Sequence, residues 1–308
     1  MAEPASVILL MGPTASGKTA LAVEMARRLD GEIISVDSAL VYRSMDIGTA
    51  KPTLAERGGI PHHLLDILDP RESFSTGQFR SQALALIADI QRRGKRALLV
   101  GGTMLYFSAL TQGLAQLPEA DPEIRARLDD ELLRLGKDVL YRRLCEVDPD
   151  SAARIHVNDP QRIQRALEVY EISGQPLSSF FRQQDDAPEH RYRTLIIAPA
   201  ERKMLHDKIA VRFDHMLTQG FLDEVMALRE RGDLHVGLPS IRCVGYRQAW
   251  AYLDGEYDRD TMREKAIIAT RQLAKRQFTW LRKVQDVAHL ISEAPNLLAQ
   301  ALECVNDD

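Results

Sequence analysis

A short loop near the amino terminus constrains the fold of this chain more than any other feature of the sequence. Residues 12–19 read GPTASGKT and match the pattern GxxxxGK[ST] at every fixed position. The apolar run Ser6–Met11 before the loop predicts a buried parallel strand, and the periodic apolar residues from Lys18 to Leu29 predict a helix after it. In that setting, backbone N–H groups and a helix N-terminus wrap a diphosphate. The sequence therefore predicts a site for a phosphorylated ligand, without saying which ligand or which bond breaks.

Every residue of this glycine-rich loop is a candidate ligand of the diphosphate. Lys18 adds a positive charge against the phosphates, and the Thr19 hydroxyl is the candidate ligand for Mg²⁺. The alternative is a glycine-rich turn with a lysine placed by chance, which the flanking strand and helix disfavour. The candidate diphosphate-binding residues are Gly12, Pro13, Thr14, Ala15, Ser16, Gly17, Lys18 and Thr19.

Strands and helices alternate in the first third of the chain. Residues 32–36 predict a second strand that ends at Asp37, and residues 97–100 predict a third that ends before Gly101-Gly102-Thr103. A predicted helix over residues 77–93 separates them. Alternation of this kind is typical of a parallel sheet, whose ligand sites lie at the carboxyl ends of the strands. We therefore expect Gly12, Asp37 and Thr103 to meet at one edge of the sheet.

The strand signals disappear from about residue 117 to residue 190. Prolines separate helical stretches there, including residues 125–135 and 160–173. Residues 193–199 then restore a strand, and predicted helices over 201–219, 221–231, 261–283 and 297–305 surround a last strand at 287–291. The predicted fold is α/β, a P-loop parallel-sheet core with an inserted all-helical domain. We assign residues 1–116 and 191–308 to the core and residues 117–190 to the insertion.

Charge and cysteine usage restrict the class of protein. The formal net charge is −4, but residues 242–283 hold 10 basic and 5 acidic side chains, so any nucleic acid would bind through local contacts. The three cysteines lie far apart without a CxxC pair, which indicates buried or incidental thiols in a reducing compartment and not a zinc site. No apolar run is long enough for a membrane segment, so a cytoplasmic protein is expected. His62 and His63 are interpreted as structural, because neighbours on a strand point to opposite faces.

Asp37 and Thr103 each have more than one interpretation. The Asp37 carboxylate either holds Mg²⁺ through water, accepts a proton from a nucleophile beside the diphosphate, or shapes the turn after its strand. Thr103 follows two glycines that let a ligand approach the backbone, and it also suits the N-cap of a helix.

Further motifs extend the pattern over most of the chain. They are GPTASGKT at 12–19, DSALVYR at 37–43, DIGTAKP at 46–52, GGTMLY at 101–106, NDPQRIQRALEVYEISG at 158–174, RCVGYR at 242–247 and KRQFTWLR at 275–282. Together, from residue 7 to about residue 283, they closely resemble the tRNA dimethylallyltransferase family, also called the tRNA isopentenyltransferase family.

This resemblance implies transfer of a dimethylallyl group from dimethylallyl diphosphate to the exocyclic N6 amine of the adenine immediately 3′ of the anticodon in tRNA. The loop then holds the diphosphate of the donor, and not ATP, with Mg²⁺ as the cofactor. Asp37 takes the amine proton and Thr103 helps to fix the adenine, so these two are the candidate catalytic residues. An allylic diphosphate ionises readily once its oxygens are neutralised. A monomeric prenyl transferase of tRNA modification, independent of membranes, is expected.

The resemblance also implies a set of tRNA contacts. Arg162 and Arg165 lie three residues apart on one helix and can both face a phosphate backbone. On the 261–283 helix an apolar stripe, which includes Trp280, is expected opposite a basic stripe of Arg271, Lys275 and Arg282. The candidate tRNA-binding residues are Asp37, Ser38, Ala39, Leu40, Thr103, Arg125, Gln161, Arg162, Ile163, Gln164, Arg165, Arg242, Cys243, Val244, Gly245, Tyr246, Arg247, Lys275, Arg276, Gln277, Phe278, Thr279, Trp280, Leu281 and Arg282.

Two positions depart from the commoner family pattern. Leu40 stands where glutamine is usual, which removes one side-chain hydrogen bond to RNA. Met104 stands where glycine is usual, and we expect it to narrow the entrance to the site.

Two other functions suit the residues without the resemblance. A P-loop kinase that phosphorylates a small metabolite from ATP would use the same loop and Asp37, with the helical insertion as a lid. A nucleotide-binding RNA switch without chemistry would show RNA binding and no product.

Overall fold

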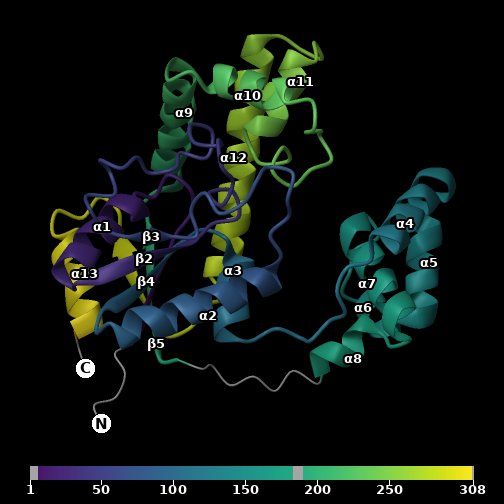
Figure 1. Cartoon of the computed structure of the whole chain (residues 1–308), viewed down its shortest axis with the longest axis horizontal. Helices are drawn as coiled ribbons and strands as arrows, with labels where there is room; N and C mark the ends of the chain where they lie inside the picture. The colour runs from purple at the N-terminus through teal and green to yellow at the C-terminus, as the bar shows by residue number, and fades with distance from the viewer. Residues whose placement is uncertain (1–5, 183–189, 307–308) are drawn as a thin grey trace. The chain divides into compact units, whose positions relative to one another are not determined.

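The computed structural model describes residues 6–182 and 190–306 of the 308-residue chain. Six strands in these residues form one sheet in the order β3-β2-β4-β1-β5-β6, and every neighbouring pair is parallel. The α/β class and the parallel-sheet core are therefore confirmed (Figure 1). The strands are β1 Val7–Met11, β2 Gly31–Val36, β3 His62–His63, β4 Arg96–Gly101, β5 Tyr192–Ala198 and β6 Val287–Ile291.

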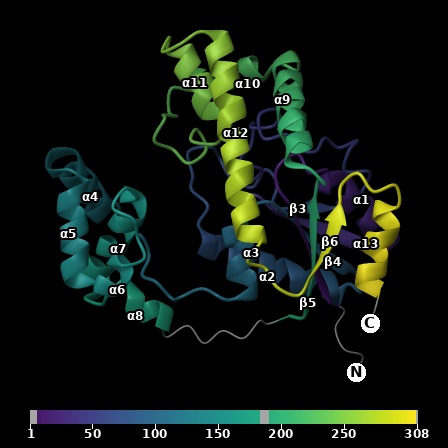
Figure 2. The same cartoon turned by 180° about the vertical axis from the view of Figure 1, so that it is seen from behind.

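Helices cover both faces of the sheet, which explains why its central strands are apolar on both sides. Helices α1 (Lys18–Arg28) and α13 (Leu297–Asn306) pack on the face that carries Ile8 and Leu10 of β1. Helices α2 (Thr76–Arg92) and α3 (Met104–Thr111) pack on the opposite face, with Val7, Leu9 and Met11. Both views show the sheet between these two helix pairs (Figures 1 and 2). The alternating side chains of β1 thus contribute to two separate hydrophobic clusters.

Four helices form a third cluster beyond the end of the sheet, as Figure 2 shows from behind. The long helix α12 begins after Asp258, whose side chain accepts a hydrogen bond from Thr261 N at 2.8 Å. It runs through this cluster and contacts α3 near its carboxyl end. The four helices are α9 Arg202–Thr218, α10 Phe221–Glu230, α11 Tyr246–Leu253 and α12 Arg259–Leu281.

Residues 112–188 form a compact unit of their own, and residues 1–111 with 189–308 form the other. The smaller unit is helical in its described residues and buries its own cluster, which includes Leu128, Leu144 and Ile163. Aspartates cap three of its helices, each followed by a proline in the first turn. Residues 183–189, next to the predicted boundary at residue 190, lie outside the described residues. The helices are α4 Pro122–Leu135, α5 Lys137–Val147, α6 Pro149–Ala152, α7 Pro160–Ser173 and α8 Leu177–Arg182.

The histidine pair, the cysteines and the apolar character of the helices are also subjects of the sequence-based predictions. His63 Nε2 lies 2.8 Å from Glu32 Oε2 and His62 Nδ1 lies 2.8 Å from the Ile60 carbonyl oxygen, so both histidines have structural partners, as predicted. The three cysteines are free, but Cys145 is exposed, so it is not a buried thiol. Within residues 6–182 and 190–306, no helix combines the length and the apolar character that crossing a membrane requires.

Candidate active site

The carboxyl ends of three neighbouring strands are joined by hydrogen bonds. Because β4 lies between β1 and β2, Gly12 N donates to the Gly101 carbonyl at 3.3 Å. On the other side, the backbone N–H groups of Gly102 and Thr103 donate to the Val36 carbonyl at 3.2 Å and 3.1 Å. The segments after these strands therefore meet at one edge of the sheet, as the alternating pattern predicts.

The Thr103 side chain connects two of these segments. Its Oγ1 accepts a hydrogen bond from Ser38 N at 3.1 Å and lies 3.5 Å from Ser38 Oγ. Helix α3 begins at the next residue, Met104. Thr103 thus occupies the N-cap position of α3, where its carbonyl accepts from Phe107 N at 3.4 Å, while its hydroxyl holds the loop after β2 against the end of β4.

Asp37 shapes the turn after β2 and also faces a cavity. Its Oδ1 accepts hydrogen bonds from Ala39 N at 2.8 Å and Leu40 N at 3.4 Å, which is the geometry of an Asx turn. The residue lines the cavity described below. The turn interpretation and a chemical role are therefore compatible, because only one carboxylate oxygen is needed for these backbone contacts.

The glycine-rich loop connects β1 to α1 with two residues in the left-handed region, Ala15 at φ 61° and Gly17 at φ 82°. Lys18 Nζ donates to the Pro13 carbonyl at 3.2 Å, across the loop. The Ser16 hydroxyl is buried and has no hydrogen-bond partner among the described residues. Thr19, the candidate metal ligand, is exposed at the start of α1. The hydrogen bond to the Pro13 carbonyl thus holds the Lys18 ammonium against the loop itself.

A cavity of about 530 Å³ opens at this edge of the sheet. Lys18, Asp37 and Thr103 all line it, so the three residues that the sequence singled out face one space. Helices α9 and α12 and the segment before α11 supply the other walls. The lining residues are Thr14, Ala15, Lys18, Asp37, Ser38, Ala39, Gly48, Thr49, Gly102, Thr103, Met104, Leu105, Ile209, Arg212, Phe213, Met216, Pro239, Arg242, Cys243, Val244, Gly245, Tyr246, Thr270, Leu273, Arg276, Gln277 and Trp280.

Four cations line the cavity, Lys18 and Arg212 together with Arg242 and Arg276, and Asp37 is the carboxylate among the lining residues. Burial lowers the pKa of Lys18 to about 8, the charge of Asp37 opposes that shift, and the charge of Arg212 adds to it. Burial also lowers the pKa of Arg212, again opposed by Asp37. Bringing a polyanion to these two cations would compensate their mutual repulsion. The cavity is therefore suited to a phosphorylated ligand with a carboxylate beside it.

Arg212 is a site residue that the sequence analysis missed. It lies on α9, and its Nη2 donates to the Thr49 carbonyl at 3.4 Å. No sequence signal distinguishes it, because α9 carries several other charged residues with the spacing of a solvated helix face. Only the packing of α9 against α12 and the loop after β2 directs it into the cavity.

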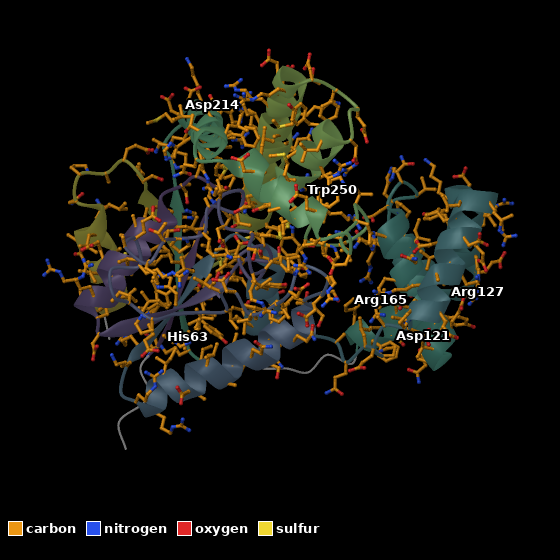
Figure 3. All side chains as sticks on the ribbon, turned by 45° about the horizontal axis from the view of Figure 1, so that its top comes forward. His63, Asp121, Arg127, Arg165, Asp214 and Trp250 are labelled. Carbon is orange, nitrogen blue, oxygen red and sulfur yellow. The ribbon has the colours of Figure 1, made fainter. Side chains whose placement is uncertain are left out.

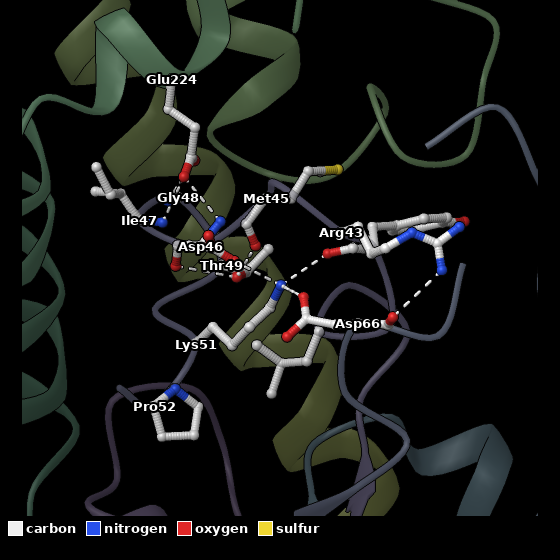
Figure 4. A network of polar contacts seen from close by, with 12 residues as sticks. Arg43, Met45, Asp46, Ile47, Gly48, Thr49, Lys51, Pro52, Asp66 and Glu224 are labelled. Atoms are coloured by element: carbon white, nitrogen blue, oxygen red, sulfur yellow. Dashed lines mark hydrogen bonds and ion pairs between the residues drawn. The ribbon is translucent and has the colours of Figure 1, made fainter. Parts of the chain in front are cut away.

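The cavity wall at Gly48 and Thr49 is held by a carboxylate from another helix. Glu224 of α10 accepts hydrogen bonds from the backbone N–H groups of Asp46 and Ile47, both at 2.8 Å, and of Gly48 at 3.1 Å (Figure 4). Its other contact is the Tyr246 hydroxyl, which donates to Glu224 Oε1. Three successive N–H groups around one carboxylate form an anion nest. The nest gives the loop after β2 a fixed conformation.

Lys51 closes the same loop from the inside. Its side chain is 3% exposed, and Nζ donates to the Tyr42 carbonyl and to Asp46 Oδ1, both at 2.7 Å, and to Asp66 Oδ1 (Figure 4). A buried ammonium needs such partners, because an unpaired charge in the interior is costly. Lys51 is therefore a structural residue of the motif DIGTAKP and does not line the cavity in the described part of the chain.

The predicted tRNA-contacting residues of the larger unit fall into two groups. Arg242, Cys243, Val244, Gly245 and Tyr246 line the cavity, as do Arg276, Gln277 and Trp280 of α12. Lys275 and Arg282 are exposed on α12, whereas Leu281 is buried in the core. The side chain of Leu281 is therefore not available to RNA.

The predicted division of α12 into two stripes is wrong at two positions. Trp280 is 41% exposed and lines the cavity, so it is not part of the buried stripe. Arg271 is half-buried and donates through Nη2 to the His206 carbonyl at 3.4 Å, so it is not on a solvated face. The contact with α9 determines the environment of Arg271.

The two departures from the family pattern have different surroundings. Met104 is 7% exposed and lines the cavity at the start of α3, where its side chain occupies space that a glycine would leave open. The backbone N–H of Leu40 donates a hydrogen bond to Asp37 Oδ1. Leu40 is half-buried, and it is not among the described residues that line the cavity.

The smaller unit holds the remaining predicted RNA contacts. Arg125 Nε and Arg165 Nη1 donate to the buried carboxylate of Glu168 at 2.8 Å and 2.6 Å, and Figure 3 labels Arg165 on this unit. Arg162 is 68% exposed and pairs with Asp159 at 3.3 Å. Ile163 is fully buried, so its side chain is not available to contact RNA. The exposed Arg162 is thus available to a ligand, whereas Arg125 and Arg165 form ion pairs with the buried Glu168.

The donor set for a metal is sparse. Within the described residues, no group of three or more His, Cys, Asp or Glu side chains could hold a metal ion. Mg²⁺ commonly takes one or two protein oxygens and completes its shell with phosphate oxygens and water. Thr19 is exposed beside the glycine-rich loop and carries one hydroxyl, which fits that kind of site, but it is not among the residues that line the cavity in the described part of the chain.

The fold and the cavity define a class of α/β protein that has a glycine-rich loop after β1, an aspartate after β2 and a separate helical unit. The sequence model of the IPP transferase family matches residues 40–284, and the chain belongs to this family. A Methylococcus capsulatus protein named tRNA dimethylallyltransferase is 57% identical, covering 97% of this chain and 96% of its own length. A protein of the same name from Burkholderia cenocepacia is 55% identical, with coverages of 98% and 95%.

Solved structures agree with these sequence matches. The full-length tRNA isopentenylpyrophosphate transferase from Bacillus halodurans superposes with a TM-score of 0.71 at 36% identity, covering 98% of this chain and 94% of that one. A eukaryotic dimethylallyltransferase acting on tRNA superposes with a TM-score of 0.86 at 29% identity, covering 98% and 79%. The resemblance drawn from the motifs is confirmed.

Proposed function

We propose that this protein transfers a dimethylallyl group from dimethylallyl diphosphate to the exocyclic N6 amine of the adenine immediately 3′ of the anticodon in tRNA, with release of diphosphate. One observation carries the proposal: Lys18, Arg212 and Asp37 line a single cavity in a chain of the IPP transferase family. The names of the relatives given above describe enzymes that act on tRNA. The cavity offers cations for a diphosphate and a carboxylate for a proton, which such a reaction requires.

The donor diphosphate binds at the glycine-rich loop. Its oxygens accept hydrogen bonds from loop amides and face the ammonium of Lys18 and the guanidinium of Arg212. The C–O bond to the allylic carbon breaks more easily as negative charge on the leaving diphosphate is stabilised. Apolar side chains of α9, Ile209 and Phe213, line the same cavity and offer contacts to the five-carbon group.

The acceptor adenine enters from the side of Asp37. The N6 lone pair is delocalised into the ring, so the amine is a weak nucleophile and gains from losing a proton as the C–N bond forms. The Asp37 carboxylate takes that proton through the oxygen that the turn does not use. An adenine in a single-stranded loop leaves its stack at low cost, which brings N6 within reach.

Mg²⁺ would be held by the Thr19 hydroxyl and would supply further neutralisation of the diphosphate charge. Arg242 and Arg276, which line the cavity, and the exposed Arg162 of the helical unit would bind the RNA backbone. The protein acts as a monomer in the cytoplasm.

The test is incubation of the purified protein with dimethylallyl diphosphate, Mg²⁺ and a tRNA that carries adenine at this position. Mass spectrometry of the digested RNA should show one dimethylallyl group on that adenine. A parallel reaction with ATP in place of the donor should leave the RNA and small alcohols unphosphorylated. Folded protein that produces no modified adenine would disprove the proposal.

A further inference from the structure

We infer that Gln277 is a positioning residue of the donor site, which fixes the glycine-rich loop against the end of β4, and that it does not contact RNA. This inference rests on the proposed function, because the donor diphosphate gives the loop its role. It reassigns a residue that the motif KRQFTWLR places among the tRNA contacts.

The side-chain amide of Gln277 has two specific partners. Oε1 accepts a hydrogen bond from Thr14 N at 2.9 Å, and Nε2 donates to the Gly102 carbonyl at 3.0 Å. The side chain is 7% exposed although it lies on a long helix with exposed neighbours. Both partners are backbone groups. If the amide were flipped, its NH₂ group would face the Thr14 N–H and its oxygen would face the Gly102 carbonyl oxygen, so both hydrogen bonds would be lost. The orientation of the amide is therefore determined.

Gly102 provides independent evidence that the contact is closely fitted. A Cβ atom built at Gly102 would lie 2.4 Å from Gln277 Nε2, which no side chain can tolerate without displacing the amide. The second glycine of GGTMLY thus leaves room for Gln277, and not only for a ligand. The three residues Thr14, Gly102 and Gln277 all line the cavity.

The contact limits how the loop can bind a diphosphate. The Thr14 N–H is committed to Gln277, and the Ser16 N–H donates to the Pro13 carbonyl at 3.3 Å. The anion is therefore held by the other loop amides, those of Ala15 and of Gly17 onward, and by Lys18. The Gly102 carbonyl, on the other side of the amide, precedes Thr103, whose hydroxyl holds the segment that carries Asp37. One side chain of α12 therefore sets the distance between the donor loop and the acceptor side of the cavity.

Three variants test this role. Gln277→Leu removes both hydrogen bonds and preserves the approximate size of the side chain. Gln277→Glu keeps an acceptor for Thr14 but places a carboxylate against the Gly102 carbonyl, where only the protonated acid can donate. Gln272→Leu is the matched control, since it makes the same change on an exposed position of the same helix.

Calorimetry with inorganic diphosphate and with an anticodon stem-loop separates donor from RNA binding. Gln277→Leu should weaken diphosphate binding at least tenfold and change stem-loop affinity by less than twofold, whereas Gln272→Leu should change neither. A tenfold loss of stem-loop affinity with diphosphate binding intact would overturn the inference and restore Gln277 to the RNA contacts.

The pH profile of Gln277→Glu gives a readout that a purely structural role would not move. Burial and the facing carbonyl raise the pKa of the new carboxyl, so its turnover relative to the wild type should rise at least fivefold from pH 8 to pH 6. The same ratio for Gln277→Leu should stay flat. A flat ratio for Gln277→Glu would refute positioning, even if Gln277→Leu proves too unstable to study. Wild-type protein that modifies no adenine would instead refute the proposed function, so the two failures are distinguishable.

Discussion

Thr103 and Ser38 lie 65 residues apart in the sequence, yet Thr103 Oγ1 accepts a hydrogen bond from Ser38 N at 3.1 Å. This bond closes the gap between the ends of β4 and β2, and it leaves Asp37 at the start of a defined turn. A hydroxyl that follows a strand can thus orient a carboxylate on the neighbouring strand without touching it.

Asp37→Asn separates the turn from the chemistry. The asparagine Oδ1 can still accept from Ala39 N, so the turn and the thermal stability should persist. Asparagine cannot take a proton, and we expect kcat to fall by about 10²–10⁴-fold. Single-turnover transfer to tRNA measures the loss, with inorganic diphosphate binding as the control. Turnover near that of the wild type would show that Asp37 only shapes the turn and does not accept the proton.

Donor binding should weaken as the pH rises through about 8. The pKa of Lys18 is lowered to about 8 mainly by burial, so its ammonium loses its proton near this pH in the free protein. A diphosphate prefers the protonated form, and its affinity should fall by up to about tenfold per pH unit above 8. Titration calorimetry from pH 7 to pH 9.5 measures this effect. Lys18→Arg, which stays charged, should bind without that pH dependence, and an equal dependence in both proteins would contradict the assignment.

Glu224→Ala should loosen the wall of the cavity. Three backbone N–H groups lose their acceptor, which should cost about 1–3 kcal/mol of unfolding free energy. The KM for dimethylallyl diphosphate should also rise, because Arg212 bonds to the Thr49 carbonyl in the same loop. Denaturant unfolding and steady-state kinetics report the two effects. Asp223→Ala, at the exposed neighbouring position, is the control and should change neither value.

The acid stability of the sheet should depend on Glu32. A hydrogen bond from Arg93 lowers the pKa of this carboxyl to about 2, and His63 adds to the shift. A depressed carboxyl pKa contributes stability above the unfolded value near 4.5, and that contribution is lost as the pH falls from about 4.5 toward about 2. Glu32→Gln should therefore unfold more easily at pH 6 and lose less stability over that range. A curve parallel to that of the exposed Glu303→Gln would contradict this prediction.

Arg162→Ala should weaken tRNA binding without affecting the donor. Its side chain is 68% exposed and pairs only locally with Asp159 among the described residues. Loss of one phosphate contact should reduce the slope of log affinity against log salt by about 1. Arg134→Ala, 65% exposed on α4 and paired with Asp130, is the matched control and should keep the wild-type slope. Equal slopes for the two variants would exclude a phosphate contact at Arg162.

The sequence alone determined the parts of the site that depend on local chain geometry. A glycine-rich loop between a strand and a helix has few conformations, so GPTASGKT predicted a loop between β1 and α1 at the cavity without any tertiary information. Polar residues after successive parallel strands must share one edge, so Asp37 and Thr103 could be assigned to the same site. The ordered motifs also identified the family, which the comparisons bear out.

Only the tertiary structure decided which residues of the remaining helices reach that edge. Arg212 and Glu224 look like ordinary polar residues of amphipathic helices, because the periodicity of a helix does not identify the neighbour against which it packs. The motif KRQFTWLR placed Gln277 among the tRNA contacts, and only the structure shows that its amide bonds to Thr14 and Gly102. The backbone partners of these three residues lie between 163 and 263 residues away in the sequence. Such contacts arise from the packing of whole elements, and no local pattern encodes them.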